Sequence, residues 1–267
     1  MIPKKLHYVW IGDGEPPEQD REYIAGWQRA CPGWEIRRWG LDDMKDVACR
    51  FAQEAIASKK WVFASDWLRL WALSNEGGFY LDTDVELKSS LERFCGDSLC
   101  MGLNLNHCPQ TALIGAEPHH PIIEEMLAEY AKKRFILAEG CYDETANTDR
   151  FYKLFRRHGV KLETLTQEHA TEVMPGVRLY PAWLVGRPSA GKENVAHHHG
   201  KGTWLTPYKR KAIYELPFGY RVVRMRMRMR YIKDDSPLEL LAHEKPVKKL
   251  VLGRTVLVLV KKEKVRR

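Results

Sequence analysis

Hydrophobic positions along this chain recur with two spacings: alternate residues in some segments, and every third or fourth residue in others. Alternation and short apolar runs that end at glycine or proline predict strands. Such segments are residues 6–11, 34–39, 77–87, 99–105, 111–116, 177–180 and 182–185. Helical spacing marks residues 21–30, 41–60, 66–75, 121–135 and 149–157. Ser65 is the expected N-cap of the third helix, which Gly77-Gly78 closes.

The alternation of strands with helices predicts an α/β fold with a mainly parallel central sheet and flanking helices. Such sheets bind ligands beyond the carboxyl ends of their strands. Asp82 and Asp84 fall at such an end. Residues 195–204 are rich in histidine and glycine and are expected to form a loop.

The triplet Asp82-Thr83-Asp84 places two carboxylates around one residue. In an extended chain residues i and i+2 point to the same side, so both carboxylates can face one small volume. Paired carboxylate oxygens suit a hard divalent cation. The alternative for the bare tripeptide is a solvated turn.

Charge divides the chain near residue 200. From Lys201 onward there are 19 basic and 6 acidic residues, a net charge of +13, whereas the first 200 residues carry 24 basic and 29 acidic ones. We therefore expect an α/β domain over residues 1–208 and a basic C-terminal extension over residues 209–267. A basic end attracts the phosphates of nucleic acid, lipid headgroups or pyrophosphate-linked substrates.

The sequence of two segments of the extension fits more than one secondary structure. Arg224, Arg226, Arg228 and Arg230 alternate with methionine. They would form one basic edge in an extended chain or a broad basic surface in a helix, and either a solvated face or an anion contact fits. Residues 250–260 are apolar and fit a strand or a short interfacial helix.

The six cysteines include no CxxC pair, which favours free thiols in a reducing cytoplasm over a zinc site. The N-terminus shows no apolar signal region, and no segment approaches the roughly 20 apolar residues of a membrane span. These features predict a cytoplasmic protein.

Three blocks of sequence resemble glycosyltransferase family 32, the DXD sugar transferases. The first is the segment 2–12, which is similar to the family's opening strand. The second joins residues 63–69 to residues 77–84 and resembles its central signature. The third is the segment 197–204, in which Thr203 stands where the family usually has serine. The blocks occur in the family's order, and the resemblance implies a GT-A-type nucleotide-sugar-binding fold.

The resemblance also implies roles for polar residues. Asp84 is the expected metal ligand, and Asp82 would bridge the metal and the donor or hold donor hydroxyls. His199 would approach the metal or the diphosphate, and the alternative for the three adjacent histidines is a metal-scavenging or merely exposed loop. The ion would be Mn²⁺ or Mg²⁺ and would stabilise negative charge on the leaving diphosphate. Asp66 and Arg69 share a helix face and are candidates for donor binding, with a mutual ion pair as the alternative.

Further donor contacts are expected from aromatic residues and from the central signature. By resemblance, Tyr8 or Trp10 would stack on the nucleotide base, whereas core packing is the alternative. Ser65 belongs to the same signature as Asp66. Trp204 would cover the nucleotide when its loop closes.

The expected activity is therefore metal-dependent transfer of a sugar, with retention of configuration, from a nucleotide-sugar donor to a hydroxyl acceptor. UDP is favoured as the nucleotide, and the acceptor would be a saccharide or lipid-linked saccharide in cell-surface polysaccharide or glycolipid assembly. The basic extension would hold the enzyme at the inner face of an anionic membrane. Two alternatives are a basic nucleic-acid-binding protein, which the net acidic first 200 residues disfavour, and an inactive sugar-binding relative.

Overall fold

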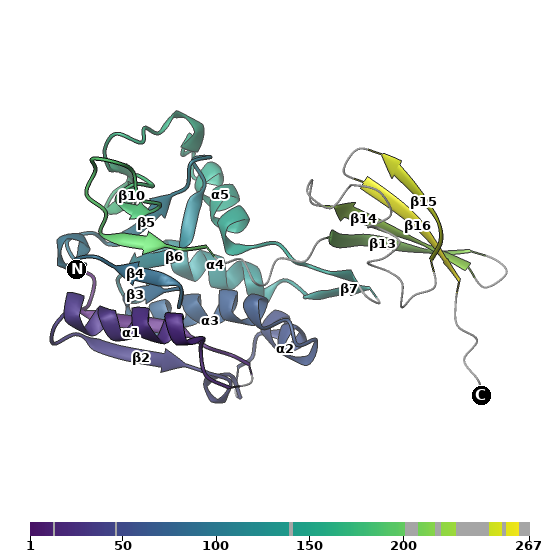
Figure 1. Ribbon diagram of the computed structural model, residues 1–267, viewed down its shortest axis with the longest axis horizontal. Helices are drawn as coiled ribbons and strands as arrows, with labels where there is room; N and C mark the ends of the chain where they lie inside the picture. Colours follow the sequence, from purple (N-terminus) through teal and green to yellow (C-terminus); the bar gives the residue numbers. More distant parts are fainter. Residues whose placement is uncertain are drawn as a thin grey trace. The chain divides into compact units, whose positions relative to one another are not determined.

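The computed structural model describes residues 1–200, apart from 13, 46, 139 and 140, and the segments 208–216, 220–227, 246–252 and 255–261. The chain forms two compact units (Figure 1). The first unit consists of residues 1–133 and 145–201, and the second of residues 134–144 and 202–267. The second unit thus includes a segment from the middle of the chain in addition to the basic end.

The first unit is built on a seven-stranded sheet, in the order β2-β1-β3-β6-β5-β10-β9. Its strands are β1 (Lys5–Val9), β2 (Glu35–Trp39), β3 (Gly78–Leu81), β5 (Leu99–Leu103), β6 (Pro109–Ala116), β9 (Thr171–Met174) and β10 (Val177–Tyr180). Strand β1 pairs in parallel with β2 and β3, and β5 with β10, whereas β6 and β9 run antiparallel to their neighbours. Five of the seven strands therefore share one direction, which confirms the predicted α/β class.

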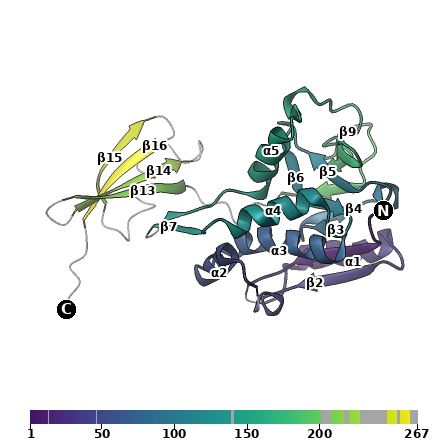
Figure 2. The ribbon, with the colours of Figure 1, turned by 180° about the vertical axis from the view of Figure 1, so that it is seen from behind.

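Helices flank this sheet, as the pattern predicts. They are α1 (Glu18–Ala30), α2 (Arg50–Ala57), α3 (Trp61–Glu76), α4 (Pro121–Ala131) and α5 (Asn147–Arg157), and short 3₁₀ helices lie at Asp42–Met44, Glu92–Phe94 and Leu162–Thr164. Helix α3 buries ten of its sixteen residues and lies beside α4 in both views (Figures 1 and 2). Helix α1 packs Trp27 into an apolar cluster with Leu6 and Phe79.

A second, three-stranded sheet joins distant parts of the sequence. Its strands are β4 (Val85–Leu87), β11 (Val185–Gly186) and β12 (Ala196–His198), in the order β11-β12-β4. Strands β12 and β4 are antiparallel, with His198 opposite Val85 and His197 opposite Glu86. The prediction of a loop over 195–204 was therefore wrong for residues 196–198, because buried Val195 and Ala196 anchor this segment in the core.

Two helix predictions also need correction. The segment 41–60 is not one helix, since only Asp42–Met44 and Arg50–Ala57 are helical. Ser65 is not an N-cap. Helix α3 begins at Trp61, and the Ser65 hydroxyl donates a hydrogen bond of 3.0 Å to the Trp61 carbonyl. Burial of Phe63 and Ala64 favours the earlier start, because they add an apolar first turn to the helix.

The regular secondary structure in the described part of the second unit consists of strands. A hairpin of β7 (Ile136–Ala138) and β8 (Cys141–Tyr142) accompanies an antiparallel sheet in the order β13-β14-β16-β15. The sheet strands are β13 (Tyr208–Leu216), β14 (Tyr220–Met227), β15 (Pro246–Leu252) and β16 (Thr255–Lys261). The apolar segment 250–260 thus contributes to two strands, and Arg224 and Arg226 lie in an extended chain, whereas Arg228 and Arg230 fall outside the described residues.

Candidate functional site

The Asp82-Thr83-Asp84 triplet lies directly after β3, at the edge where the parallel strands β1, β2 and β3 end. It forms a tight turn, since the Val85 amide donates to the Asp82 carbonyl at 3.0 Å. The Thr83 hydroxyl donates to the buried Asp20 carboxylate at 2.9 Å, which ties the turn to α1. The carboxylates are therefore brought together by a turn. The extended strand that was expected from the sequence is not what positions them.

The turn gathers Asp82 and Asp84 with His198 of β12. One ligand atom from each side chain lies within 4.8 Å of the other two. Nε2 of His198 is 3.3 Å from Oδ1 of Asp84. Burial acts to lower the pKa of His198, but the hydrogen bond to Asp84 and the charge of Asp82 raise it overall. This small volume therefore favours positive charge.

The three adjacent histidines do not face the same way. Side chains alternate along a strand, so His198 reaches the aspartates while His199 contacts Glu86 and His197 lies near it. His199 is tied to the aspartates through its backbone, because its amide donates to the Asp84 carbonyl at 3.1 Å. The structure thus brings His198, one residue before the predicted His199, to the Asp pair.

Arg69 of α3 holds Asp82 in place. Its Nη1 lies 3.1 Å from Oδ1 of Asp82 and donates to the Thr111 carbonyl at 2.8 Å, and its Nη2 lies 3.2 Å from Oδ1 of Asp66. The guanidinium also lies over the Tyr80 ring, 4.4 Å from its centre, and the Tyr80 hydroxyl donates to Oδ1 of Asp82 at 2.7 Å. Both of these contacts to Asp82 are made by Oδ1, so its orientation is fixed from one side.

Burial strongly affects the Asp66–Arg69 pair, because each residue is only 5% exposed. Desolvation lowers the pKa of Arg69, but the carboxylate of Asp82 and then Tyr80 and Asp66 raise it overall, so the guanidinium stays charged. Desolvation raises the pKa of Asp66 although Arg69 opposes this. The ion pair between Asp66 and Arg69, which was the alternative to donor binding, is therefore present.

Asp66 is also anchored to α5. The Asn147 amide donates to Oδ2 of Asp66 at 3.3 Å, and the Asn147 side chain donates to the Asp66 carbonyl at 2.6 Å. The Tyr130 hydroxyl in turn donates to Asn147 at 2.6 Å. Sequence reasoning missed Asn147, Tyr80 and His198. Of these, only His198 had a usable signal, namely the alternation of faces in a histidine run.

The remaining predicted residues are Tyr8, Trp10, Ser65 and Trp204. Tyr8 is half-buried, with its ring edge-on to Trp27 at 5.8 Å, which is the core-packing alternative. Trp10 follows the end of β1, and its indole donates to the Gly14 carbonyl at 2.9 Å. Ser65 is bonded within α3. Trp204 lies outside the described residues.

The cluster of Asp82, Asp84 and His198 fits a divalent cation. Two carboxylates and one imidazole form a predominantly oxygen donor set, which suits Mn²⁺ or Mg²⁺ better than a thiolate-preferring ion. Arg69 and Tyr80 bind Asp82 from behind, which is the role of outer partners that orient metal ligands.

Comparison with known proteins finds a family match that includes the aspartate turn. Residues 17–102 match the family described as "Glycosyltransferase sugar-binding region containing DXD motif". An uncharacterised glycosyltransferase of Acanthamoeba polyphaga mimivirus is 26% identical over 58% of this chain and 64% of its own length. "Subversion of eukaryotic traffic protein A" of Legionella pneumophila is 30% identical over 32% of this chain and 17% of its own length. The chain thus spans less than two thirds of these relatives.

Solved structures with a partial likeness are also glycosyltransferases by title. The PaToxG glycosyltransferase has 18% identity and a TM-score of 0.42 over 49% of this chain and 61% of its own. A glycosyltransferase involved in glycosylation of the major capsid of PBCV-1 has 10% identity and a TM-score of 0.45 over 74% of this chain and 94% of its own. The match to the family model includes both aspartates of the turn. Residues 17–102 are therefore similar to a glycosyltransferase sugar-binding region of the DXD type.

Proposed function

We propose that the whole protein is a metal-dependent glycosyltransferase that moves a sugar from a nucleoside diphosphate donor to a hydroxyl acceptor. One observation supports this most strongly. Asp82 and Asp84 of the matched DXD region meet His198 at the carboxyl edge of the sheet, although more than 100 residues separate the two segments in sequence. A site assembled from distant segments is more specific than the bare tripeptide.

The proposed roles follow from position. Asp82, Asp84 and His198 would hold the cation, which when bound supplies Lewis-acid stabilisation of negative charge on the departing diphosphate. Arg69 and Asp66 are buried behind Asp82, so they act as positioning residues that keep its carboxylate oriented. Trp10 lies beside the same edge and is the better placed of the two predicted base-stacking residues, because Tyr8 packs on Trp27.

The nucleotide, the stereochemistry and the acceptor are proposed from the resemblance to glycosyltransferase family 32. We propose UDP as the donor nucleotide, retention of configuration, and Trp204 as a cover for the bound nucleotide. The acceptor would be a saccharide or lipid-linked saccharide. Helices in the described part of the chain fall short of the length and apolarity of a membrane span. The proposed membrane contact at the inner leaflet is peripheral and rests on the basic extension, because the net charge from Lys201 onward is +13.

Donor binding and turnover test this proposal together. The full chain is screened by thermal shift with UDP- and GDP-sugars, with and without Mn²⁺, since a bound nucleotide stabilises the fold by mass action. Slow hydrolysis of the stabilising donor is then followed. We expect one nucleotide class to raise the melting temperature only when Mn²⁺ is present. Tight, salt-sensitive nucleic-acid binding without donor binding or turnover would instead favour the nucleic-acid alternative.

A further inference from the structure

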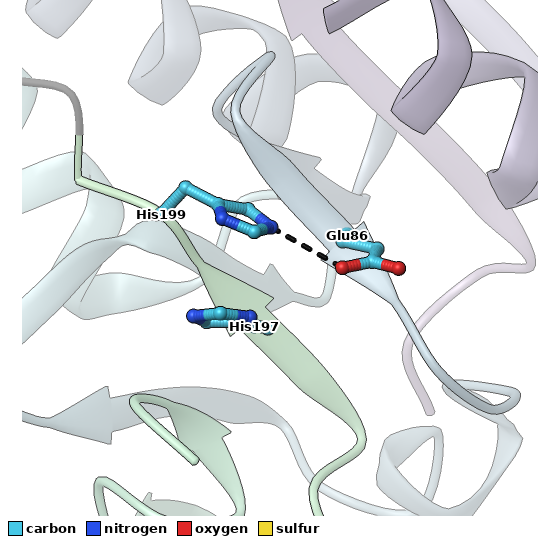
Figure 3. Close-up of side chains that lie close together, drawn as sticks. All are labelled: Glu86, His197 and His199. Atoms are coloured by element: carbon cyan, nitrogen blue, oxygen red, sulfur yellow. Dashed lines mark hydrogen bonds and ion pairs between the residues drawn. The ribbon is translucent and has the colours of Figure 1, made fainter. Parts of the chain in front are cut away.

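A second group of metal-ligating side chains lies beside the Asp pair, on the other side of the histidine segment. Glu86 of β4, His197 of β12 and the following His199 each direct a ligand atom to within 4.8 Å of the other two. Figure 3 shows the three side chains gathered together, with His199 directed at Glu86. None of them contributes to the Asp82, Asp84 and His198 cluster.

The backbone fixes this arrangement. His197 lies directly opposite Glu86 in the antiparallel pairing of β12 with β4. Alternation along the chain returns His199 to the same side, so that the two imidazole rings lie 4.0 Å apart, centre to centre. Nε2 of His199 is 3.2 Å from Oε2 of Glu86.

Neighbouring side chains orient two of the three ligands. The Tyr23 ring of α1 stacks on His199 at 4.7 Å and 9°, which limits rotation of the imidazole. Lys88 pairs with Oε1 of Glu86, so Oε2 is the oxygen turned to His199. Such outer contacts commonly orient metal ligands.

The donor types differ from those of the Asp pair. Two imidazole nitrogens and one carboxylate oxygen suit zinc and similar transition ions, whereas two carboxylates and one imidazole suit harder ions. Ligand atoms around a tetrahedral zinc ion lie about 3.3 Å apart, given bonds of about 2.0–2.1 Å. Small side-chain rotations would bring atoms already within 4.8 Å to that spacing.

We propose that Glu86, His197 and His199 bind a zinc-type divalent cation that fastens the end of β12 to β4. His198 lies between the two histidine ligands in sequence, so the bound ion would also hold His198 beside Asp84. The site stands on its own ligand geometry and does not depend on the proposed transferase reaction.

Cobalt and zinc binding to the full-length, chelator-treated protein tests this site. Co²⁺ is titrated while its visible absorption reports imidazole coordination, and Zn²⁺ is then added in competition. Asp84→Asn serves as the background, because it removes a ligand of the first cluster only. We expect this variant to keep one Co²⁺ site that Zn²⁺ displaces. Addition of Glu86→Gln or His199→Asn should weaken Co²⁺ binding at that site by at least about tenfold. Loss of a residue that only hydrogen-bonds to a metal ligand already has an effect of this size.

Two controls separate ligand loss from unfolding. Arg93→Gln keeps all three ligands and their neighbours and should bind Co²⁺ as tightly, because Arg93 pairs with Glu193 and not with the cluster. Circular dichroism identifies any misfolded variant, and His197→Asn then replaces it in the comparison. Equal Co²⁺ affinity with and without these ligands would overturn the proposal. Loss of all Co²⁺ binding in Asp84→Asn alone would also overturn it, since the ion would then belong to the first cluster.

Discussion

At the scale of single residues, the site depends on buried polar side chains. Arg69 contacts Asp66, Asp82 and the Thr111 carbonyl at once, in a position 5% exposed. A planar guanidinium can satisfy several acceptors in fixed directions, whereas an ammonium is a compact point charge. The orientation of Asp82 therefore depends on the shape of Arg69 as well as on its charge.

Arg69→Lys should lower the free energy of unfolding by about 2 kcal/mol, because at least one hydrogen bond between charged partners is lost in a buried site. Chemical denaturation measures this change. The matched control is Arg93→Lys, since Arg93 forms a half-exposed ion pair with Glu193 and should change stability by less than about 0.5 kcal/mol. Equal effects at the two positions would refute the positioning role.

His7 makes stability depend on pH. It is fully buried, with Nε2 2.7 Å from the Gly77 carbonyl and Nδ1 3.1 Å from the Trp39 indole nitrogen. Since the indole can only donate, Nδ1 must accept and Nε2 must carry the proton, so the ring is neutral. Burial lowers the pKa of His7 below its ordinary 6.5.

The direction in which stability changes with pH follows from proton binding. As the pH falls below 6.5, the unfolded chain takes up a proton that folded His7 refuses, so the stability of the fold decreases. We expect denaturation midpoints to fall over this range, and His7→Asn to flatten the slope while lowering stability overall. The exposed substitution Gln19→Ala, which changes no ionisable group, is the control and should leave the slope unchanged. An unchanged slope in His7→Asn would contradict this assignment.

At the scale of elements, turns and strand ends position the chemistry. The Gly77-Gly78 link lets α3 enter β3, and both glycines have positive φ, +62° and +96°. A Cβ at Gly78 would lie 2.8 Å from the Lys5 carbonyl oxygen, in the neighbouring strand β1. Strand β3 leads directly into the aspartate turn, so this backbone conformation also supports the site.

Gly78→Ala should therefore destabilise the protein by about 1–3 kcal/mol, from strain at positive φ and from the close backbone contact. Thermal or chemical denaturation gives the value. Gly96→Ala is the matched control, because its Cβ would meet nothing within 4 Å. If both variants unfold alike, the link is not under the constraint described.

Sequence patterns predicted those elements in which local and tertiary preferences agree. Val177–Tyr180 matches its predicted strand because apolar residues alternate and glycine precedes them. The prediction of one helix over 41–60 was wrong, because the helical part is interrupted and residues 47–49 are not helical. Alternation alone separates His198 from His197 and His199, but which of the two sides faces the aspartates depends on the pairing of β12 with β4, a contact between distant segments.

At the scale of the whole molecule, charge is concentrated in the C-terminal part of the chain, which carries +13 from Lys201 onward. Each basic residue near an anionic surface contributes about 1 kcal/mol, an attraction that salt screens. We expect the full chain to sediment with vesicles containing anionic lipid at low salt and to be released at high salt. Sedimentation equal to that with neutral vesicles would remove the proposed membrane contact.

The central claim is that Asp84 serves a metal-dependent sugar transfer, and the initial rate of nucleotide-sugar turnover tests it most directly. Wild-type protein, Asp84→Asn and the surface control Asp42→Asn, whose side chain is 89% exposed, are compared with Mn²⁺ and with chelator. We predict Mn²⁺-dependent turnover that Asp42→Asn retains and Asp84→Asn loses by about a hundredfold or more, without loss of fold. Undiminished Mn²⁺-dependent turnover in Asp84→Asn would contradict the account.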